Sequence, residues 1–400
     1  MKILVTLPWM PYPASDGGKQ GSLNMLVELQ HKMDIVLVYP IVSKEQLAYV
    51  DDLKKVLPKV KLYPFKYYKN KGRYKSQYFL FRLHRILTKK FLKQPYLATP
   101  VYQDEYLNHV KDIIHREQID IVQNEYFEQL FLVYALPDNV KKIFIQHEIQ
   151  YVAKERMIAQ QDYPLSVNYL ARLQKENEIV ALNQYDKIIT MTDIDKAILE
   201  KDGVITPIYS SPSFIPLQEG SYYKDCQRNS ICFIGGSGHY PNLNGVTWFL
   251  DEVWPLILDK KPDFQFKIVG KWNPEIIEDY KKKYKNIVFL GFVENLSFAI
   301  SDSIMIVPIK IGSGIRMKIL EAVNCYVPFV TTTVGVEGLD FKNDKDCIIT
   351  DVPKEMAEGI VRISSDSILS ETFAKKAYET LVNKYSPKAS SNRRLIILNN

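Results

Sequence analysis

The sequence predicts an α/β fold of two doubly wound domains, each built on a parallel β-sheet. Short, continuously apolar runs of strand length alternate with amphipathic segments of helix length, which is typical of parallel strands covered by helices on both faces. The pattern restarts after the proline- and serine-rich segment 207–216. The length of 400 residues is sufficient for two domains with separate cores.

The first half of the chain contains five expected strands with helical patterns between them. The strands are Lys2–Thr6, Asp34–Tyr39, Asp120–Gln123, Lys142–Gln146 and Lys187–Met191. The clearest helical segments are Gly21–His31, Val101–Arg116 and Val167–Asn183.

The second half repeats the alternation. Its expected strands are Ser230–Ile234, Phe264–Val269, Asn286–Leu290, Ser303–Val307, Val327–Thr331 and Asp346–Ile349. Its expected helices are Leu243–Asp259, Glu275–Lys283, Arg316–Val323, Lys354–Ser364 and Glu371–Lys384. We therefore expect domains at 1–210 and 228–385, a linker at 211–227, and a tail at 386–400 that could return to the first domain.

The net charge of +6 comes from one local feature. Lys66–Lys93 holds ten Lys/Arg and no Asp or Glu, so the rest of the chain is net negative. Wound as a helix, residues 74–93 place basic and leucine-rich faces opposite each other. Two interpretations stay open: a core-packed helix with a solvated basic face, or contact with an anionic membrane surface. Nucleic acid is not expected, because no recognition motif accompanies the charge.

We expect neither an export signal in this sequence nor a membrane-spanning helix. Pro8 interrupts the first apolar run, and no uncharged apolar stretch reaches 18 residues. The four cysteines, Cys226, Cys232, Cys325 and Cys347, lack metal-ligand spacing. We expect free thiols in a cytoplasmic protein, with peripheral attachment to the inner face of the membrane as the further option.

The most informative segment is Val307–Ala322, in which a strand, a glycine loop and a helix follow one another. Backbone N–H groups of Gly312, Ser313 and Gly314 at a helix start suit a phosphate. Arg316 and Lys318 oppose the helix dipole, so they need an anionic neighbour or outward, solvated side chains. The alternative is a tight turn before a solvated helix face. The segment is not a Walker A motif.

This segment resembles the donor-binding signature of glycosyltransferase family 4, in the subfamily with a proline, a GSG loop, Arg-x-Lys and Leu-Glu-Ala. Further segments agree in the right order: Phe233–Gly236, His239–Asn242, Lys267–Gly270, Phe289–Val293, Thr331–Thr333 and Gly335–Leu339. The resemblance implies the GT-B fold, with two Rossmann-like domains facing across a cleft. It also implies a retaining, metal-independent transferase that takes a sugar from a UDP- or GDP-sugar to a glycan or lipid-linked acceptor, in cell-surface polysaccharide or glycoconjugate synthesis.

The resemblance assigns roles in the donor domain. Glu321 would hold the ribose, and Gly312, Ser313 and Gly314 would lie along the diphosphate and the donor sugar. Gly270 and the loop Gly291–Val293 would border the base.

The chain departs from the family at two places. Ser313 replaces the first of two glutamates that many relatives carry, and the loop 237–242 lacks their Arg and Lys pair. We infer that Arg316 and Lys318 take over the anion contact. Asn242 and Gly335 are secondary candidates.

The first domain supplies a second group of candidates. Gly17 and Gly18 end a proline-rich loop at a helix start, where backbone can approach a ligand closely. His147 and Glu148 follow a strand, at the end where doubly wound folds place chemistry. A similar His in the family lies beside the reacting sugar, so we expect His147 to orient the sugar.

Asp193 and Asp195 resemble a metal-binding DxD motif, but they open a helix, so Thr192 or Asp193 is interpreted as its N-cap. We expect no metal and no cofactor. Two alternatives to a transferase remain: a nucleotide-sugar epimerase on the same fold, and a non-catalytic nucleotide-binding partner protein.

Overall fold

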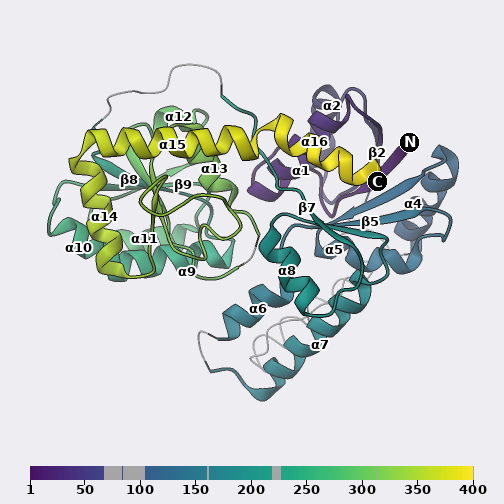
Figure 1. The fold of residues 1–400 in the computed structure, drawn as a ribbon, viewed down its shortest axis with the longest axis horizontal. Coiled ribbons are helices and arrows are strands. Elements are labelled where there is room, and N and C mark those ends of the chain that lie inside the picture. Colours follow the sequence, from purple (N-terminus) through teal and green to yellow (C-terminus); the bar gives the residue numbers. More distant parts are fainter. Residues whose placement is uncertain (67–82, 84–103, 160–161, 219–226, 313, 400) are drawn as a thin grey trace. The chain divides into compact units, whose positions relative to one another are not determined.

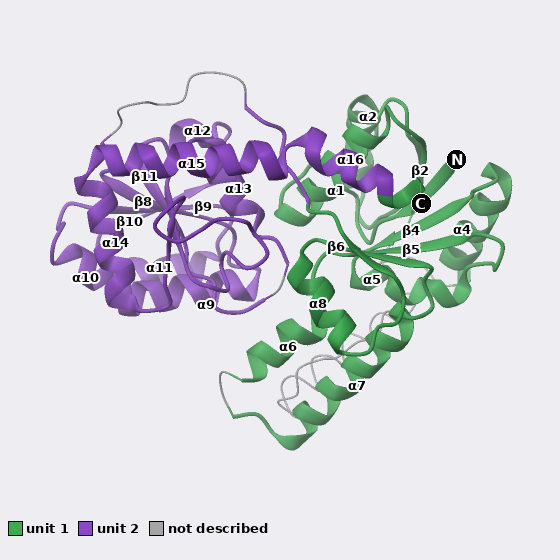
Figure 2. Cartoon of the chain, viewed as in Figure 1, with its two compact units in different colours: residues 1–212, 397–400 green, residues 213–396 purple. Residues whose placement is uncertain are grey.

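The computed structural model describes residues 1–66, 83, 104–159, 162–218, 227–312 and 314–399. The chain forms two compact units, which Figure 2 distinguishes by colour. The first consists of Met1–Pro212 with Ile397–Asn400, and the second is Ser213–Ile396.

The first unit is built on a seven-stranded parallel sheet in the order β3-β2-β1-β4-β5-β6-β7 (Figure 1). Its strands are β1 (Lys2–Thr6), β2 (Asp34–Ile41), β3 (Lys61–Lys66), β4 (Ile121–Glu125), β5 (Lys141–Gln146), β6 (Lys187–Thr190) and β7 (Ile208–Ser210). Its helices are α1 (Gly17–Leu29), α2 (Glu45–Val56), α4 (Asp104–Glu117), α5 (Phe127–Leu130), α6 (Gln150–Ile158), α7 (Leu165–Leu182) and α8 (Asp193–Lys201), with a 3₁₀ turn at Phe131–Ala135.

The second unit is built on a six-stranded parallel sheet in the order β10-β9-β8-β11-β12-β13. Its strands are β8 (Ser230–Ile234), β9 (Gln265–Val269), β10 (Ile287–Gly291), β11 (Ser303–Val307), β12 (Phe329–Thr331) and β13 (Ile348–Ile349). Its helices are α9 (Tyr240–Trp248), α10 (Trp254–Leu258), α11 (Pro274–Lys283), α12 (Leu296–Ala299), α13 (Met317–Asn324), α14 (Pro353–Ser365), α15 (Ser367–Tyr385) and most of α16 (Pro387–Asn399), which ends in the first unit.

The burial pattern explains the sheets. All five residues of β11 are buried, as are the apolar residues of β1 and the first four residues of β8. Helices cover both faces of such strands, which is why they lack the alternation of a half-exposed sheet. Both units are therefore doubly wound parallel-sheet domains, as the sequence predicts.

The expected helix Leu243–Asp259 is interrupted. Five residues, Phe249–Val253, form a π-helical turn between α9 and α10, and Pro255 lies in the first turn of α10. Proline has no N–H to donate, so a regular helix cannot pass through this position with all its hydrogen bonds.

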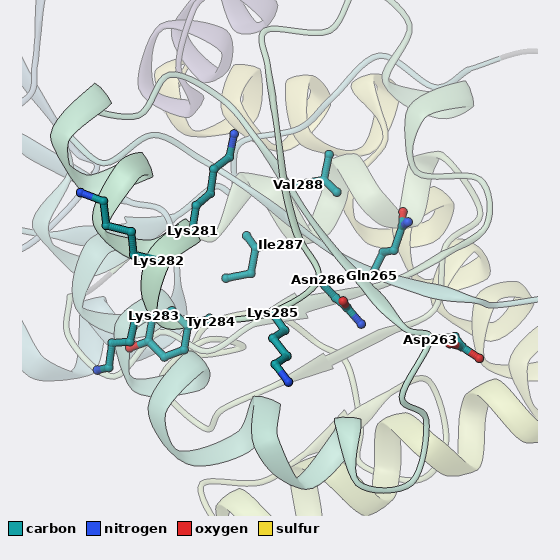
Figure 3. A pocket seen from close by; sticks show the side chains of 10 residues that line it. All are labelled: Asp263, Gln265, Lys281, Lys282, Lys283, Tyr284, Lys285, Asn286, Ile287 and Val288. Carbon is teal, nitrogen blue, oxygen red and sulfur yellow. The ribbon is translucent and has the colours of Figure 1, made fainter.

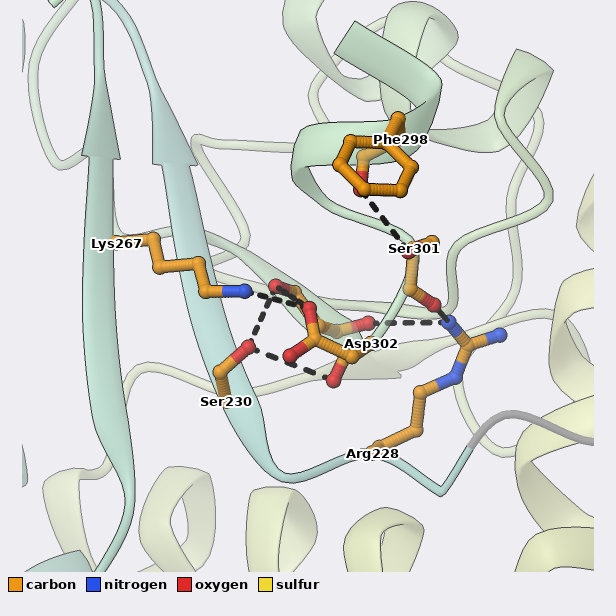
Figure 4. A network of polar contacts seen from close by, with 7 residues as sticks. Arg228, Ser230, Lys267, Phe298, Ser301 and Asp302 are labelled. Carbon is orange, nitrogen blue, oxygen red and sulfur yellow. Dashed lines mark hydrogen bonds and ion pairs between the residues drawn. The ribbon is translucent and has the colours of Figure 1, made fainter. Parts of the chain in front are cut away.

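A buried polar network anchors the amino ends of the second sheet (Figure 4). The Arg228 guanidinium, 6% exposed, donates to the carbonyls of Ser301 and Tyr326, the latter at 3.2 Å. Beside it, Lys267 Nζ donates to Asp302 Oδ1 at 2.6 Å. These contacts fix the start of β8 against the start of β11, at the end of the sheet opposite its glycine loops.

Several predictions concern segments or residues that lie wholly or partly outside the described residues. The basic stretch Lys66–Lys93 lies outside the described residues except for its first residue and Leu83, so membrane contact through it stays a prediction. Three of the four cysteines are free and buried, and Cys226 lies outside the described residues. Within the described part of the chain, no helix has the length and apolar character needed to span a membrane.

Candidate functional site

Each sheet reverses its strand order beside its first strand. The reversal lies between β1 and β4 in the first unit and between β8 and β11 in the second. In open α/β sheets, the loops at the carboxyl ends of these two strands diverge to opposite faces and leave room for a ligand. The sequence-predicted candidates gather around these two switch points, so each unit is described from there.

In the second unit, the loop after β8 meets the first turn of α13. Lys318 Nζ donates to Asn242 Oδ1 at 2.6 Å, and Asn242 Nδ2 donates to the carbonyl of Gly236 at 2.9 Å. Asn242 is buried in the first turn of α9. The amide thus connects a lysine from beyond β11 to the backbone that follows β8. Lys318, Asn242, Gly235 and Gly236 are called the lysine cluster below.

The glycines of this cluster are needed because of close contacts. Gly235 has a φ of +146°, and a Cβ there would lie 2.7 Å from Asn242 Nδ2 and 2.9 Å from Lys318 Nζ. Its carbonyl accepts a hydrogen bond from Trp272 Nε1 at 2.8 Å. Gly270, at a φ of +123°, packs its backbone directly against Gly235. Any side chain at either position would displace the lysine or the loop.

The pKa of Lys318 lies well below the usual value for a lysine. Burial lowers the pKa of its ammonium to about 7, and the nearby Arg316 charge lowers it further, while Glu321 opposes the shift. The ammonium also lies over the Phe233 ring, 4.2 Å from the centroid. Lys318 therefore has an anionic neighbour in Glu321, one of the two environments expected from the sequence, and Lys318 does not extend outward into solvent. It turns inward, to a neutral amide and an aromatic face.

The remaining donor-site candidates surround α13. Arg316 occupies its N-cap position, and its Nη1 donates to the carbonyl of Gly314 at 3.2 Å. Gly312 and Gly314 both have positive φ, +118° and +76°, as a tight glycine loop requires. Glu321 is half-buried one turn further along the helix. Ser313 lies outside the described residues.

Gly335 has a packing role. A Cβ there would lie 2.6 Å from the carbonyl oxygen of Val307, and its N–H donates to Thr332 Oγ1 at 2.9 Å. The residue brings the loop after β12 against the end of β11.

In the first unit, the switch point holds an aromatic and carboxylate cluster. His147 Nε2 lies 2.9 Å from Glu125 Oε2, and the Tyr126 ring stacks on the imidazole at 3.8 Å between centroids and an interplanar angle of 3°. The Tyr126 hydroxyl donates to the carbonyl of Gly18 at 2.6 Å, and Trp9 packs against Tyr126 at 4.4 Å. These five residues are called the histidine cluster below.

The other first-unit candidates have different surroundings. Gly17 is exposed in the first turn of α1, which begins four residues before the expected start because the Asp16 side chain caps it. Glu148 is half-buried, and its carboxylate accepts a hydrogen bond from Gln150 Nε2 at 3.2 Å. Among the described residues, the hydrogen bonds of Glu148 do not include one to His147.

Sequence reasoning missed Glu125 and Tyr126, because the strand was expected to end at Gln123 while β4 continues to Glu125. A signal was present. Polar residues at 123–125 follow two apolar ones, which is unusual for a buried strand unless its carboxyl end carries chemistry.

The DxD-like segment is a helix start. Thr192 is the N-cap of α8, and its Oγ1 accepts the N–H of Asp195 at 2.9 Å. Over the described residues, no group of three or more His, Cys, Asp or Glu side chains is placed to hold a metal ion. A reaction without metal stays a prediction.

An open hollow of about 550 Å³ lies elsewhere in the second unit (Figure 3). It is lined by the lysines at the end of α11 and by the first residues of β9 and β10, namely Gln265, Lys281, Lys282, Lys283, Lys285 and Ile287 among others. These are the amino ends of the strands. The hollow is therefore separate from the lysine cluster, which lies at the carboxyl ends.

Residues 228–366 match the family model described as glycosyl transferases group 1. This range contains the lysine cluster and all six strands of the second sheet. The second unit is therefore similar to group 1 glycosyltransferases, and the match confirms the predicted enzyme class, a glycosyltransferase. The finer assignment to family 4 and its subfamily motif stays a prediction.

A curated relative and several solved structures match over the whole chain. An uncharacterized 44.6 kDa protein in the cps region of Klebsiella pneumoniae is 22% identical, with 97% of each chain covered. S. aureus TarM, solved with Fondaparinux, alpha-GlcNAc-glycerol and UDP, has a TM-score of 0.70 at 12% identity, covering both chains fully. Anabaena HepE with UDP-glucose gives 0.69 at 11% identity, covering 100% of this chain and 99% of that one. The likeness confirms the GT-B fold.

Proposed function

We propose that the protein is a retaining glycosyltransferase of family 4 that takes a sugar from a UDP-sugar to a glycan acceptor. The observation that carries the proposal is the lysine cluster: a half-buried cation beside a side-chain-free backbone, at the switch point of a group 1 glycosyltransferase domain. Two structures with the same fold were solved with UDP or UDP-glucose, which favours uridine over guanosine in the donor.

The cluster suits a leaving diphosphate. Negative charge develops on the diphosphate as its bond to the sugar breaks, and a cation in a poorly hydrated site stabilises that charge more than one in water. Lys318 would supply the charge, and the loop of Gly312 and Gly314 would supply N–H donors at the start of α13. Arg316 would act from the same turn, and Glu321 would accept hydrogen bonds from ribose hydroxyls.

The acceptor and the cellular setting are inferred from relatives. The cps region in the name of the K. pneumoniae relative favours a role in surface polysaccharide synthesis. We propose a glycan acceptor bound by the first unit, with His147 orienting the reacting sugar. We further propose that the acceptor is lipid-linked and that residues 66–93 attach the protein to an anionic membrane.

The test combines a donor screen with two lysine variants. Binding of UDP-sugars and GDP-sugars is measured by calorimetry, and nucleotide release is measured with and without a panel of glycan acceptors. Lys318→Ala should lower kcat/KM about 100-fold or more, since it removes a charge from the leaving group. Lys282→Ala, in the hollow at the opposite end of the sheet, is the matched control and should behave as the wild type.

Each alternative has its own result. A change of the sugar nucleotide without acceptor would indicate an epimerase, and binding without turnover would indicate a non-catalytic protein. Tight binding of GDP-sugars alone would contradict the uridine assignment. An NMR spectrum of the product decides retention from the anomeric configuration.

A further inference from the structure

We propose that Glu125 is a positioning residue that fixes the tautomer and the orientation of His147, so that Nδ1 is the ring nitrogen offered to substrate. The proposal rests on the proposed function, since it assigns a task within the same reaction. Nothing in the sequence pattern alone joins these two residues, because they are 22 positions apart: Glu125 ends β4, and His147 directly follows the neighbouring strand β5.

The contact between the two side chains determines the tautomer. An ionised carboxylate has no proton to donate, so the 2.9 Å contact between Glu125 Oε2 and His147 Nε2 requires the proton on Nε2. Two further donors surround the same carboxylate. Gln123 Nε2 donates to Oε1 at 2.7 Å and Ser22 Oγ donates to Oε2 at 2.9 Å. Hydrogen bonds of this kind stabilise the charged form of a buried carboxylate.

The ring is also held in its plane. Tyr126 stacks on it almost in parallel, and its own hydroxyl is fixed by the Gly18 carbonyl on α1. Tyr126 adopts a φ of +69°, a left-handed conformation that is unfavourable for a bulky residue. Such strain persists where surrounding contacts determine the conformation, and it is found preferentially at functional sites. The imidazole thus has one plane and one edge fixed before any ligand binds.

The consequence concerns the other ring nitrogen. With Nε2 donating to Glu125, neutral His147 has a lone pair on Nδ1 and can accept a hydrogen bond from a sugar hydroxyl. Replacing Glu125 with glutamine removes this bias, because an amide can turn either its oxygen or its nitrogen toward the ring. The tautomer is then no longer fixed, although the shape and volume of the side chain are preserved.

The first measurement is independent of activity. Protein labelled with ¹⁵N-histidine is examined by NMR, and His147→Gln identifies the His147 signals among the six histidines. The wild type at a pH where His147 is neutral should show the proton on Nε2. Glu125→Gln should shift the population toward the other tautomer. A wild-type proton on Nδ1, or an unchanged tautomer in Glu125→Gln, would overturn the proposal.

The second measurement separates positioning from structural support. Glu125→Gln should lower kcat about tenfold or more while the donor KM stays within about twofold, because the lysine cluster is untouched. Glu176→Gln, an exposed glutamate on α7, is the control and should keep wild-type kinetics. Wild-type kcat in Glu125→Gln would also overturn the proposal. By contrast, absence of transfer by the wild type with every donor and acceptor would contradict the proposed function, and the NMR result would still decide the role of Glu125.

Discussion

The two switch points have the same topology and opposite chemistry. In the second unit the lysine cluster joins a cation to bare backbone, with Asn242 as the connecting group. In the first unit the histidine cluster joins a carboxylate, an imidazole and two aromatic rings. The first combination suits a diphosphate, and the second suits sugar hydroxyls and ring faces. Strand order thus determines where each unit leaves room for a ligand, while the loop residues determine which chemical groups lie there.

The difference extends to how each cluster is kept in place. The lysine cluster depends on the absence of side chains, since Gly235 and Gly270 leave room only for backbone. The histidine cluster depends on side chains that lock one another, with Tyr126 strained between His147 and Gly18. Substitutions should therefore damage the first by adding atoms and the second by removing or exchanging polar groups.

The largest effect is expected from adding a methyl group to the lysine cluster. Gly235→Ala would bring a Cβ to 2.7 Å from Asn242 Nδ2 and would impose a φ of +146° on an alanine. Strain of about 1–3 kcal/mol at such a position corresponds to roughly 5-fold to 150-fold weaker donor binding. The matched control is Gly238→Ala in the same loop, where a Cβ would meet nothing within 4 Å. Equal donor affinities in the two variants, measured by calorimetry, would show that this backbone does not border the donor.

A second effect follows from the lowered pKa of Lys318, about 7. The ammonium loses its proton as the pH rises through this value, so the attraction for a diphosphate decreases. The affinity for a UDP-sugar, whose diphosphate does not titrate near neutrality, should fall by up to about tenfold per pH unit above pH 7.

Lys318→Ala provides the reference for this pH dependence. Its affinity should be lower than that of the wild type at pH 6 and should change little up to pH 8.5. A wild-type affinity that stays constant over this range would separate Lys318 from the donor phosphates.

The fold was predictable where burial is complete. The bounds of β1, β8 and β11 agree with the sequence-based expectation, because each is a continuous apolar run with a clear end. The half-exposed strand β3 was missed, since Pro64 interrupts it and a lysine lies at each of its ends. The short strand β7 was missed for the opposite reason, as three residues are too few to form a pattern.

For the candidate site, the sequence predicted several of the residues but not the contacts between them. Lys318 and Asn242 were both named from the sequence, but their hydrogen bond joins positions 76 apart and depends on how α9 and α13 flank the switch point. The inward turn of Lys318 was not foreseen, because a helix-dipole argument considers only the local turn and omits the Phe233 ring below it. Glu125 required knowing where β4 ends.

The smallest effect on activity is expected from Glu178, which supports the histidine cluster from outside. Its carboxylate is fully buried on α7 and accepts hydrogen bonds from Gln146 Nε2 at 3.1 Å and from the Tyr151 N–H at 3.3 Å, on either side of His147. Burial raises the pKa of Glu178 to about 8. Because the folded pKa exceeds the unfolded value of about 4.3, the folded state retains a proton that the unfolded chain releases.

The sign of the stability change follows from this linkage. The stabilisation from Glu178 is complete below about pH 4 and is lost as the pH rises through 8, at up to about 1.4 kcal/mol per pH unit. Glu178→Gln cannot titrate, so its unfolding free energy should decrease less between pH 5.5 and 8.5 than that of the wild type, as measured by urea unfolding. Glu176→Gln, exposed two positions away, should retain the wild-type slope of unfolding free energy against pH.

Turnover of Glu178→Gln at pH 7 should stay within a few-fold of the wild type, because Glu178 contacts Gln146 and Tyr151 and not the imidazole. A much larger loss of turnover, with an unchanged slope, would place Glu178 inside the histidine cluster and make the activity depend directly on this carboxyl group.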